Sequence, residues 1–356
     1  MTNTHRIVLE LLGIALGNRE EITLPVAIDW QEVYSFTKTQ GVYGVCLDAF
    51  NKLPTYQRPD KKVLINWIGS VLSMERLYEK YVSTIESFSD FCKSQNAPML
   101  LMKGYGRSLD YPKPNHRPCG DIDIYLWRNK ENIEQLIRAK GIPIDYSNAH
   151  HAVFSYHGFS VESHDTIMDA HTHKSNAYVN GLLEKLATEN FLNHSSNSGL
   201  VLPSVAFNSI HLLRHMASDF AEVKTSLRNV LDWSTFVAAN ELDWDFIHDV
   251  ARKSNMNKFL DVLNGICVHY LGYSQKKFPI RNSDEKLELR VLNEILTCTD
   301  AVDIPKTNIN IFGKIRYGVS KTRRLWCNRW KYAIVYDESL WNAFFWKAKN
   351  RFLQLR

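Results

Sequence analysis

The sequence has no long hydrophobic run. None of its apolar stretches approaches the roughly 18 residues needed to cross a bilayer, so no transmembrane helix is expected. The first apolar run is interrupted by Glu10 and has no small-residue cleavage site, which argues against a secretory leader. The six cysteines include no CxxC pair, a pattern typical of reduced thiols in a cytosolic protein. We therefore expect a cytoplasmic location.

Three common catalytic signatures are also missing. The chain has no GxxxxGK(S/T) phosphate loop, no GxGxxG dinucleotide fingerprint and no GxSxG nucleophile motif, so these three classes of site are not expected. In contrast, 45% of the 356 residues are hydrophobic, and 9 Trp, 16 Tyr and 17 Phe rule out wholesale disorder. This length and composition predict two or three structural units around a substantial core.

The positive charge is concentrated at the C-terminal end. The net charge is +5, but residues 312–356 contain eleven Lys and Arg against only Asp337 and Glu338. Four tryptophans are interleaved with these cations: Trp326, Trp330, Trp341 and Trp346. An amphipathic terminal helix that packs its aromatic side chains on the body is the favoured interpretation. The alternatives are that this segment contacts an anionic membrane surface or binds nucleic acid.

The pattern of apolar residues divides the chain into three parts. Residues 1–95 show helical spacing, residues 96–200 alternate between strand and helix patterns, and residues 201–356 return to helical spacing. In the middle part we expect strands at 98–102 and 120–126, a helix at 131–140, and a hairpin of strands 152–156 and 159–165 around His157-Gly158. The expected fold class is therefore α+β, with a sheet-containing core between two helical parts.

Three carboxylates form the candidate catalytic group. Asp121 and Asp123 stand two residues apart on a predicted strand, so both project from one face. Two like charges this close repel each other unless a cation lies between them, and carboxylate oxygens suit Mg²⁺. Glu162 lies on the polar face of a nearby predicted strand and can complete the site. His164, on the same face as Glu162, can orient it or contact a phosphate.

A candidate phosphate site precedes the aspartates. The predicted strand at 98–102 stops at Lys103-Gly104, and a helix that begins there would direct backbone N–H groups and a positive helix end at an anion. Arg117 can also meet phosphate charge, as can Arg228 from the helical part that follows, with Asp232 expected as the partner of Arg228 one turn later. Carboxylates and cations together indicate phosphoryl or nucleotidyl transfer.

These residues carry a family resemblance. The chain resembles the DNA polymerase beta-type nucleotidyltransferase superfamily and, more closely, a family of uncharacterised bacterial nucleotidyltransferases with a KG…YP…R..GDIDL signature. The matching residues are Leu100 to Gly104, Leu109, Tyr111-Pro112, Arg117 and Gly120 to Ile124, followed by His150-His151, Val161 to His164, and Arg228 with Asp232. The resemblance spans roughly residues 97–236 and implies a nucleotidyltransferase-type mixed sheet.

The resemblance implies roles for individual residues. Asp121 and Asp123 correspond to the metal-binding pair, Glu162 to the third carboxylate, and Gly104 to the glycine that approaches the phosphates. The nucleotide- and phosphate-binding candidates are Lys103, Gly104, Arg117, Gly120, His164 and Arg228. The chain departs from the superfamily at Gly104-Tyr105, where Gly-Gly or Gly-Ser is usual. It also departs around the third carboxylate, for which Asp165 is the alternative.

The expected reaction transfers a nucleoside monophosphate from an NTP to an acceptor hydroxyl, with Mg²⁺ or alternatively Mn²⁺ as cofactor. We expect a small-molecule acceptor rather than a long nucleic acid, because no basic patch lies near the motif. Two alternatives stay open. One is a catalytically inactive nucleotidyltransferase-like binding module.

The other alternative is a metal-dependent hydrolase that uses a histidine-rich segment. Its ligands would come from two acidic and six histidine residues: Asp165, Asp169, His150, His151, His157, His164, His171 and His173. The spacing of these residues matches no zinc motif that we can name. A second pair, His211 and His215, is interpreted as core or surface histidines, because no glutamate accompanies it as a base.

Overall fold

The computed structural model describes most of the chain. The described residues are 1–20, 24–25, 27–147, 150–168, 173–193, 199–222, 225–297 and 326–336. Within them no helix is long and apolar enough to span a membrane. Most of the basic tail, including Trp341 and Trp346, lies outside the described residues, so the alternative of contact with a membrane surface stays a prediction.

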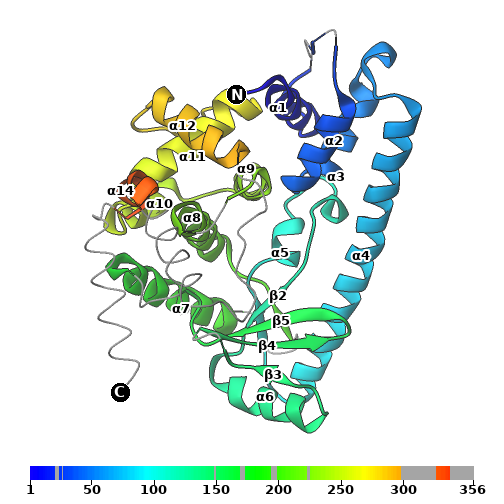
Figure 1. The fold of residues 1–356 in the computed structure, drawn as a ribbon. Helices are drawn as coiled ribbons and strands as arrows, with labels where there is room; N and C mark the ends of the chain where they lie inside the picture. Colours follow the sequence, from blue (N-terminus) through cyan, green and yellow to red (C-terminus); the bar gives the residue numbers. More distant parts are fainter. Residues whose placement is uncertain are drawn as a thin grey trace, which may run out of the picture.

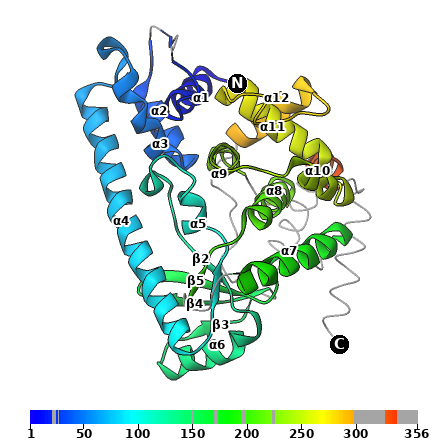
Figure 2. The ribbon, with the colours of Figure 1, turned by 180° about the vertical axis from the view of Figure 1, so that it is seen from behind.

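The first part of the chain is helical, as predicted. It contains α1 (Asn3–Ala15), α2 (Trp30–Thr39), α3 (Tyr43–Asp48), the 3₁₀ turns η1 (Phe50–Lys52) and η2 (Thr55–Gln57), and the long α4 (Lys61–Ser94). Thr2, Asp29 and Asp60 each accept backbone N–H groups at the start of α1, α2 and α4, which explains where these helices begin. Both ribbon views show α4 running from the other N-terminal helices to the sheet (Figures 1 and 2).

The middle part forms a six-stranded mixed sheet, which confirms the predicted fold class. The strands are β1 (Met99–Leu101), β2 (Ile122–Tyr125), β3 (Ile144–Asp145), β4 (His151–Tyr156), β5 (Phe159–His164) and β6 (Leu200–Val201), in the order β3-β4-β5-β2-β1-β6. Strands β2 and β5 are parallel, as are β1 and β6, whereas the β1–β2, β3–β4 and β4–β5 pairs are antiparallel. The predicted hairpin is confirmed as β4 and β5.

Short helices connect the strands. They are α5 (Tyr105–Ser108), α6 (Lys130–Ala139) and the 3₁₀ turns η3 (Pro114–His116) and η4 (Trp127–Asn129). One face of the sheet is apolar: Ile122 and Ile124 of β2 pack in one cluster with side chains of α4, among them Phe88, and of α6, among them Ile133. Because side chains alternate along a strand, Asp123 projects from the opposite face.

The last part is again helical, as predicted. It contains α7 (Lys174–Asn193), α8 (Val205–Glu222), α9 (Leu227–Ala239), α10 (Trp244–Lys253), α11 (Asn257–Leu271), α12 (Glu285–Leu296) and α14 (Arg329–Val335). Trp330 at the start of α14 packs on Phe220 and under the guanidinium of Arg290, as expected for an aromatic residue of the tail that contacts the body. Trp326 is 57% exposed.

The two helical parts share one hydrophobic core. Leu11 of α1 and Leu263 of α11 are members of the same buried cluster. Asn18 and Arg19, which follow α1, donate hydrogen bonds to the carbonyls of Leu271 and Tyr270 at 3.1 and 2.9 Å. The division at residues 95 and 200 stays a prediction, but the N-terminal helices pack against the C-terminal ones.

Candidate active site

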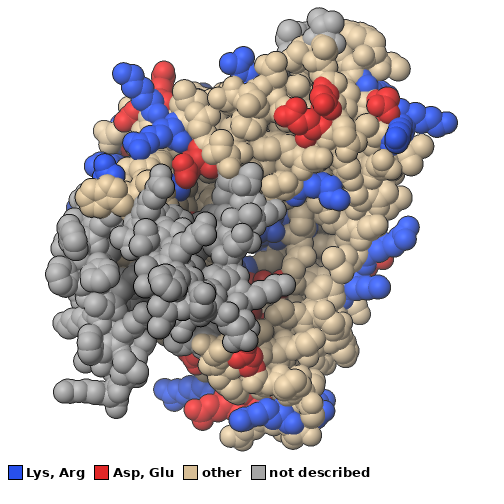
Figure 3. All heavy atoms as spheres, viewed as in Figure 1, with Lys and Arg blue, Asp and Glu red and all other residues tan. Residues whose placement is uncertain are grey.

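The three predicted carboxylates line one pocket. In the parallel pair of β2 and β5, Asp123 lies directly opposite Glu162. Asp121 precedes β2 and lines the same pocket of about 330 Å³. The register of two strands that are distant in sequence therefore brings the three acidic side chains together. The face of the molecule seen in Figure 3 has a hollow in which acidic and basic side chains are both visible.

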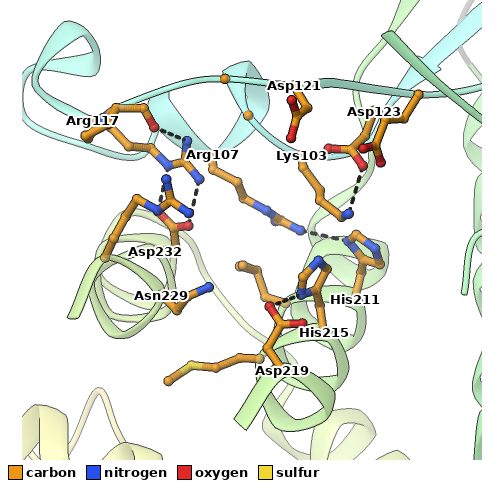
Figure 4. A pocket seen from close by; sticks show the side chains of 17 residues that line it. Lys103, Arg107, Arg117, Asp121, Asp123, His211, His215, Asp219, Asn229 and Asp232 are labelled. Carbon is orange, nitrogen blue, oxygen red and sulfur yellow. Dashed lines mark hydrogen bonds and ion pairs between the residues drawn. The ribbon is translucent and has the colours of Figure 1, made fainter. Parts of the chain in front are cut away.

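Helices α8 and α9 form the opposite wall of the pocket. His215 and Asp219 of α8 line it and lie across the pocket from Lys103 and Asp121 (Figure 4). Arg228 of α9 also lines the pocket. The start of α9 is held by a residue of the N-terminal part. The side-chain oxygen of Gln40, just after α2, accepts the Leu227 N–H at 2.9 Å, and its carbonyl accepts the Arg228 N–H at 3.2 Å.

Asp123 accepts two charge-assisted hydrogen bonds on one oxygen. Lys103 Nζ lies 2.8 Å and His164 Nε2 lies 3.0 Å from Asp123 Oδ1. Burial alone would raise the pKa of Asp123, but the charge of Lys103 and the hydrogen bond of His164 outweigh it and hold that pKa well below its usual range. Burial lowers the pKa of His164, whereas its hydrogen bond to Asp123 and the nearby carboxylate of Glu162 together raise it more strongly.

The charge of Asp121 is poorly compensated. Burial raises the pKa of its carboxyl, and the negative charges of Glu162 and Asp123 raise it further. Glu162 has a lowered pKa, mainly because the imidazole of His164 lies close to it, with Nε2 3.7 Å from Glu162 Oε2. The donor set of Asp121, Asp123 and Glu162 consists of carboxylate oxygens, and this set fits Mg²⁺.

Gly104 makes the tight turn that precedes α5. Its φ of +51° lies in the region that favours glycine, and a Cβ there would lie 2.1 Å from Tyr81 Oη. That hydroxyl donates to the Asp121 carbonyl at 2.9 Å, so the glycine allows β1 and the Asp121 segment to approach each other closely. The predicted helix after Gly104 is only four residues long, so its positive end is weaker than the sequence suggested.

Arg117 is engaged by protein groups. Its Nε and Nη2 donate to the two oxygens of Asp232 at 2.7 and 2.8 Å, and its Nη1 donates to the Pro118 carbonyl at 3.1 Å. Tyr111 also donates to Asp232, at 2.7 Å. The expected pairing of Asp232 with Arg228 is therefore corrected: Asp232 hydrogen-bonds to Arg117 and Tyr111, and Arg228 contributes only longer-range attraction. Arg117 lines the pocket, but its contact with phosphate stays a prediction.

Arg107 is a pocket residue that the sequence analysis missed. It lies on α5, is only 3% exposed, and donates to His211 Nδ1 at 3.1 Å. Burial and the positive charge of Arg107 lower the pKa of His211 well below its usual value. The imidazole that faces the Arg107 guanidinium is therefore neutral. Burial lowers the pKa of Arg107 itself to about 10, and its Nη1 is buried with no hydrogen-bond partner.

His211 and His215 agree with their interpretation as core or surface histidines, since His211 is almost fully buried and His215 is partly exposed, and both also line the pocket. His215 Nδ1 lies 3.0 Å from Asp219 Oδ2. The spacing of His211, His215 and Asp219 by four residues places all three on one face of α8, and this spacing is the signal that was visible in the sequence.

The histidine-rich segment is not one cluster. Only His151 and His164 lie beside Glu162 among the segment's described histidines. His157 stacks on Tyr156 at the hairpin turn, and His173 stacks on Tyr336 with ring centroids 3.7 Å apart. The hydrolase candidates Asp169 and His171 lie outside the described residues.

The alternative third carboxylate also lies elsewhere. The side chain of Asp165 forms an ion pair with Lys130 and is about half exposed. It is not among the residues that line the pocket, whereas Glu162 is. The geometry therefore favours Glu162.

Comparison with known proteins agrees with this geometry. Residues 27–272, more than half of the chain, match the model of a family described as "Uncharacterised nucleotidyltransferase". No curated protein and no solved structure matches the chain. The matched range contains the whole sheet, the three carboxylates, and helices α8 and α9. The chain therefore belongs to the family of uncharacterised nucleotidyltransferases.

Proposed function

We propose that the protein is a Mg²⁺-dependent enzyme that transfers a nucleoside monophosphate from an NTP to an acceptor hydroxyl and releases pyrophosphate. One observation carries this proposal: two carboxylates of adjacent parallel strands, and a third just before one of them, line a pocket that also contains Arg107 and Arg228. Acidic groups that hold a cation and arginines that meet phosphate charge are the parts that nucleotidyl transfer needs. Family membership supports the broader assignment as a nucleotidyltransferase.

Asp121, Asp123 and Glu162 would hold the magnesium. When bound there, Mg²⁺ would neutralise triphosphate charge and polarise the phosphoryl group that is attacked. Glu162 is also the candidate acceptor of the proton that leaves the acceptor hydroxyl, directly or through water. The carboxylate is ionised at neutral pH, as a proton acceptor must be, and its lowered pKa makes it a weak base.

The cationic side chains would bind and orient the triphosphate. Lys103 contacts Asp123 and has a flexible stem that lets its ammonium turn towards a phosphate oxygen. The buried Nη1 of Arg107 has no hydrogen-bond partner, and an oxyanion would satisfy it. Arg228 and His215 supply further donors from α9 and α8.

The size of the pocket supports a small acceptor. A volume of about 330 Å³ lies at the lower end of the range for small-molecule sites. The acceptor and the preferred base of the NTP are open to experiment. Membrane contact through residues 312–356 and the cytoplasmic location stay predictions.

A transfer assay tests the proposal. The purified protein is incubated with Mg²⁺, each α-labelled NTP in turn and a size-fractionated cell extract. The double variant Asp121→Asn/Asp123→Asn is run alongside, and Asp165→Asn serves as the matched control because its carboxylate does not line the pocket. We expect label to move into a product with the wild type and the control but not with the double variant. No transfer with any NTP, together with no binding of Mg·NTP, would refute the proposal.

A further inference from the structure

Two histidines extend the acidic group across a third strand. Strands β4, β5 and β2 are neighbours in the sheet, with His151 opposite His164 and Glu162 opposite Asp123. Residues that are directly opposite each other in a sheet project from the same face. The imidazoles of His151 and His164 therefore lie on the same face as the carboxylates of Glu162 and Asp123.

The nitrogen and oxygen atoms converge on one point. His151 Nε2 and His164 Nε2 each lie 3.7 Å from Glu162 Oε2, and His164 Nε2 lies 3.0 Å from Asp123 Oδ1. One ligand atom from each of His151, Glu162 and His164 lies within 4.8 Å of the other two. Metal–ligand bonds of about 2.0–2.2 Å place neighbouring ligands roughly 3–4.4 Å apart, so small side-chain movements suffice to surround an ion.

The imidazoles distinguish this position from the oxygen-only position beside it. Mg²⁺ prefers oxygen ligands and keeps several waters, whereas imidazole nitrogen suits divalent transition metals. Two histidines and a carboxylate form a donor set that such metals use with further positions open. Asp121, which directly precedes β2, offers oxygen alone.

We propose that His151, His164 and Glu162 form a nitrogen-containing cation position that binds a divalent transition metal such as Mn²⁺ in preference to Mg²⁺, next to the position at Asp121 and Asp123. Glu162 is common to this position and to the three carboxylates that would hold magnesium. This inference rests on the proposed function for the use of the metal in catalysis, but binding of the metal needs neither nucleotide nor turnover.

Metal binding can be measured on the full chain without substrate. Mn²⁺ is titrated into the protein and followed by electron paramagnetic resonance, with and without competing Mg²⁺. The comparison uses the wild type, His151→Ala and the matched control His157→Ala, whose histidine stacks on Tyr156 at the hairpin turn. We expect His151→Ala to weaken Mn²⁺ binding by about tenfold or more, while His157→Ala binds as the wild type does and Mg²⁺ affinity changes little in both.

A second measurement needs no variant. Pulsed electron paramagnetic resonance of Mn²⁺ bound to the wild type should show coupling to imidazole nitrogen. Absence of that coupling, or equal Mn²⁺ affinity of His151→Ala and His157→Ala, would overturn the inference. Its failure is separable from failure of the proposed function. If label is transferred with Mg²⁺ but bound Mn²⁺ shows no coupling to nitrogen, only the proposed metal position is refuted. If Mn²⁺ shows nitrogen coupling but no label is transferred, only the proposed reaction is refuted.

Discussion

Arg117 and Asp232 form a two-pronged ion pair that joins the loop before β2 to helix α9. Both side chains are largely buried, with 8% and 7% exposed, and their two N···O distances are 2.7 and 2.8 Å. The pair therefore fixes the wall that carries Arg228 relative to the strand that carries Asp123. Arg117 positions the site, in addition to any contact that it makes with phosphate.

We expect Arg117→Ala to destabilise the protein strongly. Removing one partner of a buried ion pair leaves the other charge without compensation, at a cost of about 3–5 kcal/mol. Urea unfolding measures this loss, and the double variant Arg117→Met/Asp232→Leu should recover part of it because neither charge is then buried alone. If Arg117→Ala were as stable as the wild type and lost only NTP affinity, Arg117 would be a ligand-binding residue alone.

Asp121→Asn should abolish transfer with no loss of stability. The Asp121 side chain is exposed in the pocket, so the change removes a metal-binding charge but no buried contact. We expect the rate to fall by about 100-fold or more, as for the loss of one strong transition-state interaction. Transfer rate and melting temperature are measured together. Full activity of the variant would contradict the assigned role of Asp121.

Arg107→Met should weaken binding of Mg·NTP without destabilising the fold. The change removes a buried guanidinium whose hydrogen-bond partner is the neutral imidazole of His211 and whose Nη1 has no partner. One hydrogen bond to a charged group contributes about 1.5–3 kcal/mol, or roughly 10–150-fold in affinity. Calorimetric titration measures the effect, with Arg128→Met as the control because Arg128 is exposed and does not line the pocket. Equal affinity of the two variants would remove Arg107 from the nucleotide site.

Gly104→Ala should disturb the turn before α5, whereas Gly106→Ala should be tolerated. A Cβ at Gly104 would lie 2.1 Å from Tyr81 Oη at a φ of +51°, while a Cβ at Gly106 has no neighbour closer than 3.8 Å. The backbone conformation alone costs about 1–2 kcal/mol for alanine. The double variant Gly104→Ala/Tyr81→Phe relieves the contact and retains the backbone strain. Unfolding of all three variants by urea measures these differences, and equal stability of the two single variants would contradict the prediction.

His116 should make stability depend on pH. Its ring lies in the loop that carries Arg117 and donates to Asp48 at 2.8 Å and Glu75 at 3.0 Å. Burial lowers the pKa of His116, as does the charge of Lys113, but the bonds to Asp48 and Glu75 raise it more. The contribution of His116 is therefore complete below about pH 6.5 and is lost as the pH rises through the raised pKa.

Asp48 has the opposite dependence. Burial raises the pKa of its carboxyl. Hydrogen bonds from His116 and Lys113 lower that pKa by more, so the net pKa of Asp48 lies below its usual value. Its contribution is present above about pH 3.9 and is lost as the pH falls through the lowered pKa.

The pH dependence from His116 can be measured by thermal unfolding. Melting temperatures of the wild type should decline on the alkaline side, and those of His116→Asn should decline less. Parallel curves for the two proteins would contradict the prediction.

Local patterns predicted four of the six strands, β1, β2, β4 and β5, and missed the two-residue strands β3 and β6. The alternation at 120–126 and the His157-Gly158 turn are visible in the sequence, because strand periodicity and turn chemistry act over a few residues. The two-residue strand β6 has no such signal, since it exists only through its pairing with β1. Its position could not be read from the sequence.

The candidate site was predictable only in part. The carboxylates stood out because Asp121 and Asp123 share a strand face. Arg107 beside His211 and Arg117 beside Asp232 are contacts between residues more than a hundred positions apart, and no spacing rule encodes them. Arg107 also looks like an ordinary residue of a helical turn until its burial is known.

Gln40 has a consequence for dissecting the molecule. It is a residue of the N-terminal part, yet its side chain and carbonyl hold the first backbone N–H groups of α9, the helix that presents Arg228. A fragment that begins at the sheet would contain every proposed catalytic carboxylate but would lack the two acceptors of Gln40 that bind the Leu227 and Arg228 N–H groups. The smallest working unit of the protein thus extends upstream of its sequence signature, and a search for a minimal enzyme should retain α2.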